Sequence, residues 1–160
     1  MGHLASWKSR IALASAISSL SACGFGNPVA DLDQGEADEK VEEYITESLS
    51  TLPEGAKLET VDGMRDSSCG DTENDNSGHV VRYKKYRILG LPAEDKEQNA
   101  ESVLEYWKQR GYSLITDSRP ERLMIRVETP DSFEIALRGD RGDDLTISAV
   151  SPCFSPYEDE

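Results

Sequence analysis

The sequence contains almost no histidine. Only His3 and His79 occur among its 160 residues, and His3 falls in a segment that we expect to be removed on export. A Ser-His-acid site would have to use His79, which begins a strand-like segment without a nucleophile motif. The chain also lacks the motifs of nucleophile elbows, phosphate-binding loops, zinc proteases and dinucleotide sites. We therefore predict a non-enzymatic protein with no catalytic residue, no metal site and no cofactor. A carboxylate pair of the glycosidase kind is the alternative in so acidic a chain.

Basic residues are scarce as well. The chain has 17 Lys and Arg against 31 Asp and Glu, a formal net charge of -14. Nucleic-acid binding depends on a basic surface that neutralises phosphates, so we exclude a nucleic-acid partner. The same charge opposes electrostatic docking on anionic lipid. The basic segments Arg82–Arg87 and Arg126–Thr129 have strand-like patterns, and we expect their long side chains on the solvent-facing side of a sheet.

No apolar run reaches the roughly 20 residues that a membrane-spanning helix needs. The charge-free segment Ile11–Ala22 follows Lys8 and Arg10, in a region without acids. A basic start followed by a short apolar run is the order of a secretory signal, and we predict a signal peptide over residues 1–22. A short buried helix is the alternative, although this run has no amphipathic period.

The residues Leu20-Ser21-Ala22-Cys23 end this segment. They resemble the lipobox of bacterial lipoproteins: a branched apolar residue, two small residues and a cysteine. The resemblance implies that the Cys23 thiol takes a diacylglycerol as a thioether, that the signal is removed before it, and that acyl chains such as palmitate hold the protein at the membrane. The alternatives are a secreted protein cut after Gly24 and retention in the cytosol.

Two cysteines are left once Cys23 is assigned to lipid. An even pair in an exported chain predicts a disulfide, here between Cys69 and Cys153. Two unrelated buried thiols are the alternative. A shared metal is disfavoured because neither cysteine belongs to a C-x-x-C motif and histidine is scarce.

Apolar residues recur with clear periods in the rest of the chain. Helical spacing predicts a helix over residues 36–51, with an apolar stripe of Ala37, Val41, Tyr44, Ile45, Leu49 and Leu52. It predicts a second helix over residues 93–110, with a stripe of Ala100, Val103, Leu104 and Trp107. Alternation predicts strands over residues 56–61 and 79–89. Four more short strands follow. They are joined by three segments of turn residues, Asp117–Glu121, Thr129–Ser132 and Gly139–Asp144. Their expected inward-facing residues are Tyr112, Leu114, Thr116, Leu123, Ile125, Val127, Phe133, Ile135, Leu137, Leu145, Ile147 and Ala149. This pattern predicts an α+β two-layer domain, an antiparallel β-meander covered on one face by helix.

The expected organisation is a signal peptide (1–22), a lipidated tether (23–35), a single α+β domain (36–157) and an acidic tail (158–160). Residues 62–78 are predicted to be a long polar loop that contains Cys69. Within it, Asp71–Gly78 alternates acids as a calcium loop does, but it lacks the glycine and the closing glutamate of an EF-hand. Weak cation binding there is left open.

Two further segments have a simple structural interpretation. Arg138–Asp144 contains Arg-Gly-Asp twice, and its glycines and aspartates are typical of a hairpin turn. Trp107 with Gly111-Tyr112 could form an aromatic platform for a ligand. Because Trp107 lies on the apolar stripe of its helix, we assign it to the core.

The chain as a whole resembles small secreted lipoproteins of high-GC Gram-positive bacteria. The resemblance depends on the lipobox, the segment Trp107–Tyr112, the alternating strands and the segment Ser151–Pro156. It implies a fold and a location on the outer face of the cell membrane rather than an activity. Our hypothesis for the function is a non-enzymatic binding module of the envelope, with an envelope protein or a small molecule as partner and ligand residues unknown. The alternatives are a hydrolase acting on wall or lipid substrates and an inhibitor-like domain that presents its turns.

Overall fold

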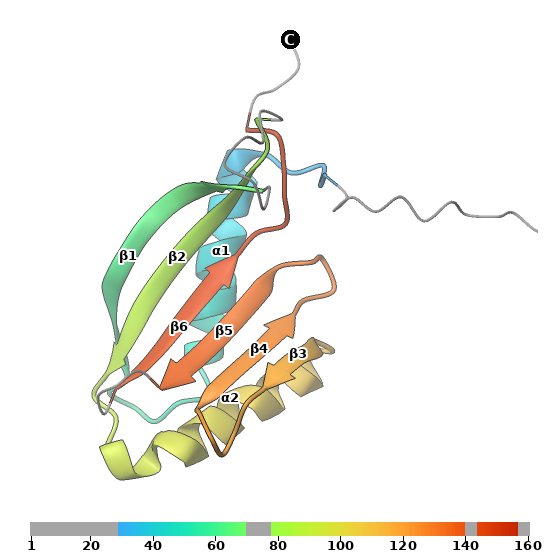
Figure 1. The fold of residues 1–160 in the computed structure, drawn as a ribbon. Coiled ribbons are helices and arrows are strands. Elements are labelled where there is room, and N and C mark those ends of the chain that lie inside the picture. Colours follow the sequence, from blue (N-terminus) through green and yellow to red (C-terminus); the bar gives the residue numbers. More distant parts are fainter. Residues whose placement is uncertain (1–28, 70–77, 140–143, 157–160) are drawn as a thin grey trace, which may run out of the picture.

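The domain consists of two layers, a six-stranded antiparallel sheet and two helices (Figure 1). The computed structural model describes residues 29–69, 78–139 and 144–156. Its elements in chain order are α1 (Gln34–Leu49), β1 (Lys57–Ser68), β2 (Val80–Leu89), the 3-10 turn η1 (Ala93–Asp95), α2 (Lys96–Gln109), β3 (Ser113–Asp117), β4 (Met124–Glu128), β5 (Glu134–Gly139) and β6 (Leu145–Val150). The α+β two-layer prediction is confirmed.

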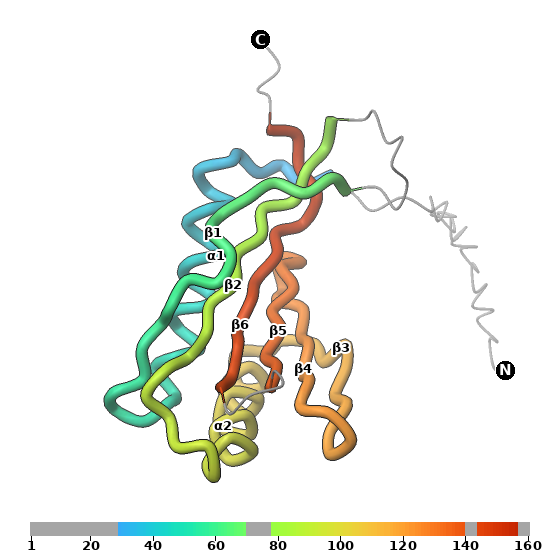
Figure 2. Tube along the Cα trace, turned by 60° about the vertical axis from the view of Figure 1, so that its left-hand side comes forward, coloured from blue at the N-terminus to red at the C-terminus, as the bar shows by residue number. Residues whose placement is uncertain are grey.

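The order of strands in the sheet is β1-β2-β6-β5-β4-β3. The last four strands form the predicted meander, and the β1–β2 hairpin joins it through antiparallel pairing of β2 with β6. In Figure 1, α1 lies behind β2 and β6, and α2 crosses the lower end of the sheet. The tube in Figure 2 shows α1 running alongside the hairpin.

The core lies between the helices and the sheet. Its helical part follows the predicted stripes, with Val41 and Ile45 of α1 and Val103, Leu104 and Trp107 of α2 all buried. The predicted inward residues of β4, β5 and β6 are buried too. Trp107 is fully buried, and its indole Nε1 donates a hydrogen bond to the Ser48 hydroxyl at 2.9 Å. The assignment of Trp107 to the core is therefore confirmed.

β1 is much longer than the sequence indicates. Residues 62–68, predicted to be loop, pair with β2 as far as Ser68 opposite Val80, with register shifts around Asp62. The side chains of this edge strand are mostly exposed, so the strand needs no apolar alternation to pair its backbone. The calcium-like residues 71–77 lie outside the described part of the chain.

β3 also departs from its predicted pattern. Leu114 was expected to face the core, but it is 52% exposed and Ile115 is 42% exposed. The register with β4 shifts between Leu114 and Thr116, and β3 is the last strand of the sheet. An edge strand with an irregular register turns its side chains partly out of the core, so alternation alone does not determine which of them is buried.

The predicted disulfide is present. Cys69 and Cys153 are bonded, with their Cα atoms 5.8 Å apart and the two residues 84 positions apart in the sequence. The bridge ties the end of β1 to the segment after β6, where the fully buried Phe154 exchanges two backbone hydrogen bonds with Val80. Cys23 lies outside the described residues. Within the described ranges, no helix is long and apolar enough to cross a membrane.

Candidate functional site

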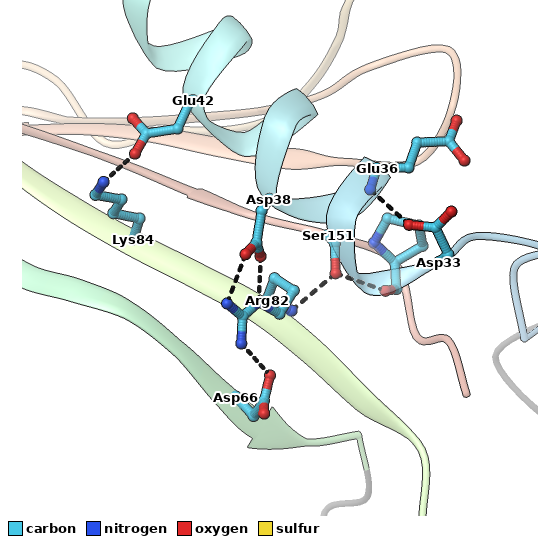
Figure 3. A network of polar contacts seen from close by, with 9 residues as sticks. Asp33, Glu36, Asp38, Glu42, Asp66, Arg82, Lys84 and Ser151 are labelled. Carbon is cyan, nitrogen blue, oxygen red and sulfur yellow. Dashed lines mark hydrogen bonds and ion pairs between the residues drawn. The ribbon is translucent and has the colours of Figure 1, made fainter. Parts of the chain in front are cut away.

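Helix α1 meets β2 through a row of charged and polar side chains (Figure 3). Arg82 of β2 is 8% exposed; its guanidinium binds both carboxylate oxygens of Asp38 and donates to Asp66 at 2.6 Å. Its backbone N–H donates to the Ser151 hydroxyl at 2.9 Å. The side-chain hydrogen bond to Asp38 outweighs burial and raises the pKa of Arg82.

The row continues one step along β2. The Lys84 ammonium pairs with Glu42, and the Tyr86 hydroxyl donates to the same carboxylate at 2.8 Å. The prediction that the basic side chains of Arg82–Arg87 face solvent is therefore wrong for Arg82 and Lys84. The acids of α1 at positions 38 and 42 are one helical turn apart and face β2, so they draw the alternate basic residues to the helix side. These groups satisfy one another, and we assign them to the structure of the domain.

An open cleft, which we call the tyrosine cleft, lies where α1, the end of α2 and the β4–β5 turn meet. Its volume is about 490 Å³, and it is lined by Tyr44, Gln109, Arg110, Tyr112, Pro130 and Asp131. The lining combines two aromatic rings with an amide, a guanidinium and a carboxylate. A concave surface of this composition is the usual form of a small-ligand site.

The β4–β5 turn places Asp131 in this cleft. The Thr129 N–H donates to the Phe133 carbonyl at 2.8 Å, and the Ser132 N–H donates to the Thr129 carbonyl at 3.0 Å. Ser132 takes a left-handed backbone conformation with φ of 67°, and Pro130 suits the second position of the turn. The turn predicted from the Thr-Pro-Asp-Ser segment is confirmed, and it points its carboxylate at α1.

Asp131 accepts three hydrogen bonds. The Tyr44 hydroxyl and the Thr129 hydroxyl donate to Oδ1, each at 2.6 Å, and the Lys40 ammonium donates to Oδ2 at 2.8 Å. Partial burial opposes ionisation, yet the bonds from Lys40, Thr129 and Tyr44 hold the pKa of Asp131 at about 2. The carboxylate is therefore ionised at any physiological pH.

Two tyrosine rings line the cleft beside this carboxylate. The rings of Tyr44 and Tyr112 meet edge to face with centroids 6.0 Å apart, and Phe133 lies 5.3 Å from Tyr44 on the inner side. Burial and the bond to Asp131 raise the pKa of Tyr44, and burial raises that of Tyr112. Both phenols stay protonated. The Tyr44 hydroxyl donates to Asp131, and both rings offer aromatic surfaces.

Glu47 of α1 organises the outer rim of the cleft. The Tyr106 hydroxyl donates to its carboxylate at 2.9 Å, and Arg110 approaches the same oxygen at 3.4 Å. Burial and this bond raise the pKa of Tyr106 to about 12. Interactions with Tyr112 and Glu47 raise the pKa of Arg110. Arg110 therefore presents a permanent positive charge beside Tyr112.

A second cavity of about 390 Å³ lies near the disulfide and includes Glu128, Ser132 and Glu134 in its lining. The two glutamates are directly opposite in the β4–β5 pair, and Arg126 pairs with Glu134. The tyrosine cleft is the better candidate because its polar groups are fixed by several hydrogen bonds and it has aromatic walls.

No family model, curated protein or solved structure matches this chain. Among the described residues, no group of three or more His, Cys, Asp or Glu side chains is arranged to hold a metal ion.

Of the predicted site residues, Cys69 and Cys153 are joined as expected. No ligand-binding residue was predicted from the sequence. Tyr112 was considered for an aromatic platform, and the structure pairs it with Tyr44 rather than with Trp107.

Proposed function

We propose that this chain is a binding module of the bacterial cell envelope, held at the outer face of the membrane by lipid on Cys23. Its ligand site is the tyrosine cleft, and its ligand is a small hydroxyl-rich molecule with a flat face, of which saccharides are the main envelope class. The observation that supports this most directly is the edge-to-face pair of Tyr44 and Tyr112 beside the hydrogen-bonded Asp131.

The electrostatics of the cleft favour binding over acid-base catalysis. General acids and bases work best with a pKa near the operating pH. The pKa of Asp131 is about 2 and that of Tyr106 about 12, and those of Tyr44, Lys40 and Arg110 are raised from values that already lie well above neutral. These groups keep one charge state across physiological pH and offer a constant set of donors and acceptors.

Binding is tested by adding a trimer of N-acetylglucosamine to the mature domain and following backbone amide signals by NMR. We expect the largest shifts at Tyr44, Tyr112 and the 129–133 turn. Tyr112→Ala should weaken binding about fivefold, because stacking on one aromatic ring is worth on the order of 1 kcal/mol. Tyr83→Ala is the matched control, since Tyr83 lies on β2 and packs under Arg65 away from the cleft.

Shifts centred elsewhere, or equal weakening by the two substitutions, would refute the cleft as the site. Turnover of a wall or lipid substrate that Asp131→Asn abolishes would favour the hydrolase alternative instead.

The anchor has its own test. Mass spectrometry of the membrane fraction should find a lipid-sized increment on Cys23, and Cys23→Ser should leave the precursor uncleaved. The disulfide supports export because such bonds persist in oxidising compartments. A mature, unmodified chain that begins at Phe25 would reject the lipid and support the secreted alternative.

A further inference from the structure

The face of the sheet opposite the helices carries a row of two arginines with a threonine between them. Arg87 of β2 opposes Thr146 of β6, and Thr146 opposes Arg138 of β5. The neighbours Tyr86, Ile147 and Leu137 belong to the helix side, so the three residues of the row point the other way. Adjacent strands are about 4.8 Å apart, which places the two arginine Cα atoms roughly 10 Å from each other.

The Thr146 hydroxyl is an unexplained polar group in this row. Thr146 is only 3% exposed, and its Oγ1 has no hydrogen-bond partner. A buried hydroxyl without a partner is destabilising, and native structures seldom contain one without a reason. The neighbouring floor is made of equally small side chains, Ser148 and Ala136, which are 9% and 8% exposed.

Long cationic side chains surround this floor. Arg87 is oriented by Glu59 at 2.8 Å and by Asp144 at 3.6 Å. Arg138 is exposed, and no carboxylate of the described residues pairs with it. In the next row, Lys85 opposes Ser148, and Ser148 opposes Ala136, which opposes Arg126. Four basic side chains therefore border a few small residues, and two of them, Arg87 and Arg126, are paired with carboxylates.

We propose that Arg87, Thr146 and Arg138 form a binding site for a small oxyanion of the phosphate type. The two guanidinium groups supply charged N–H donors from either side, and the Thr146 hydroxyl supplies the third donor from the floor. Bound anion would satisfy the hydroxyl that now lacks a partner and would neutralise Arg138. This site is on the opposite face of the sheet from the tyrosine cleft and does not depend on the function proposed for that cleft.

The charge of the whole molecule limits the size of the ligand. An extended polyanion or an anionic membrane would bring many negative charges near a strongly acidic protein, which is unfavourable beyond the local row. A compact anion is affected mainly by the nearest charges, because salt screens those farther than about 8 Å. The site therefore fits inorganic phosphate or a single phosphate group.

The experiment titrates the mature domain with inorganic phosphate against chloride at equal ionic strength, following the Thr146 amide by NMR and the melting temperature. Phosphate should shift the Thr146 signal and raise the melting temperature. Arg138→Gln should weaken binding about tenfold or more, as expected for loss of a charge-assisted hydrogen bond. Arg122→Gln is the matched control, because Arg122 is also exposed and lies in the β3–β4 connection.

Thr146→Val separates a ligand site from a packing defect. Removing the hydroxyl should raise the melting temperature in chloride and reduce the additional rise caused by phosphate. A higher melting temperature with unchanged phosphate binding would overturn the proposal, as would equal effects of Arg138→Gln and Arg122→Gln. Binding to phosphatidylglycerol vesicles that free phosphate does not displace would overturn it in favour of lipid docking.

Discussion

Asp131 joins three parts of the domain through one carboxylate. It belongs to the β4–β5 turn, accepts hydrogen bonds from Lys40 and Tyr44 of α1, and is fixed within its own turn by Thr129. The Thr129 hydroxyl in turn accepts a hydrogen bond from the Phe133 N–H at 2.9 Å. Hydrogen bonding to the charged form of a carboxylate lowers its pKa, which links this residue to acid stability.

We expect Asp131 to contribute stability that disappears in acid. Its pKa in the folded domain is about 2, below the 3.8 of an ordinary aspartate. The contribution is therefore complete above about pH 4 and is lost as the pH falls through about 2. Because the side chain is 36% exposed, solvent screening limits the effect to about 1 kcal/mol.

Urea unfolding of the wild type and Asp131→Asn between pH 7 and pH 2 measures this contribution. The difference in free energy of unfolding between the two proteins should shrink as the pH falls. Asp62→Asn provides the comparison, because Asp62 lies on β1, at the edge of the sheet away from β4 and β5. A difference that stays constant with pH would contradict the interpretation.

At the scale of elements, α1 packs on the sheet in two ways. One stripe, Ala37, Val41 and Ile45, enters the apolar core, while Asp38 and Glu42 meet the basic side of β2. The polar half of this interface depends on Arg82, whose side chain is 9% exposed, whereas Asp38 and Asp66 are 37% and 48% exposed. The buried cation is thus held by carboxylates that still reach water.

Arg82→Met tests how much the ion pairs of Arg82 contribute to the free energy of unfolding. The substitution keeps much of the apolar stem and leaves Asp38 and Asp66 without their partner, so we expect a loss of about 2 kcal/mol. Adding Asp38→Leu should recover part of this loss, because the unpaired carboxylate facing β2 is then removed. Chemical denaturation of the single and double variants measures both effects. A double variant that loses the full sum would show that the two residues are not coupled.

The elements that the sequence predicts well are those whose burial follows a regular period. The stripe of α2 and the alternation in β4 to β6 depend on a single rule, apolar residues on the covered face, and all of them are found in the core. β1 was underestimated because an edge strand pairs through its backbone and its side chains stay polar.

The cleft was harder to predict because it joins residues far apart in the sequence. Tyr44 and Asp131 are 87 positions apart, and no local pattern reports such a contact. The Thr-Pro-Asp-Ser turn was predicted, but its partner on α1 depends on how the helix lies on the sheet. In the same way, the direction of Arg82 is determined by the acids of α1 that cover β2.

The whole molecule has two distinct ends. The described chain begins beside the C-terminal segment, where the Ala30 N–H donates to the Cys153 carbonyl at 2.7 Å, and α2 lies at the other end (Figure 2). With the proposed anchor on Cys23, the membrane would be attached at the disulfide end. The disulfide therefore stabilises the end of the domain that would lie nearest the proposed anchor.

Loss of the disulfide should destabilise the whole domain. Closing a loop between cysteines 84 positions apart restricts the unfolded chain, which corresponds to about 4.5 kcal/mol in the chain-entropy model. The variant Cys69→Ser/Cys153→Ser should therefore unfold at lower urea and melt roughly 10 to 20 °C earlier, and a reducing agent should lower only the wild-type midpoint. Because α2 and β3 lie away from the bridge, the folded double variant should keep their amide signals. A variant as stable as the oxidised wild type would mean that the backbone bonds between Phe154 and Val80 hold this end without the bridge.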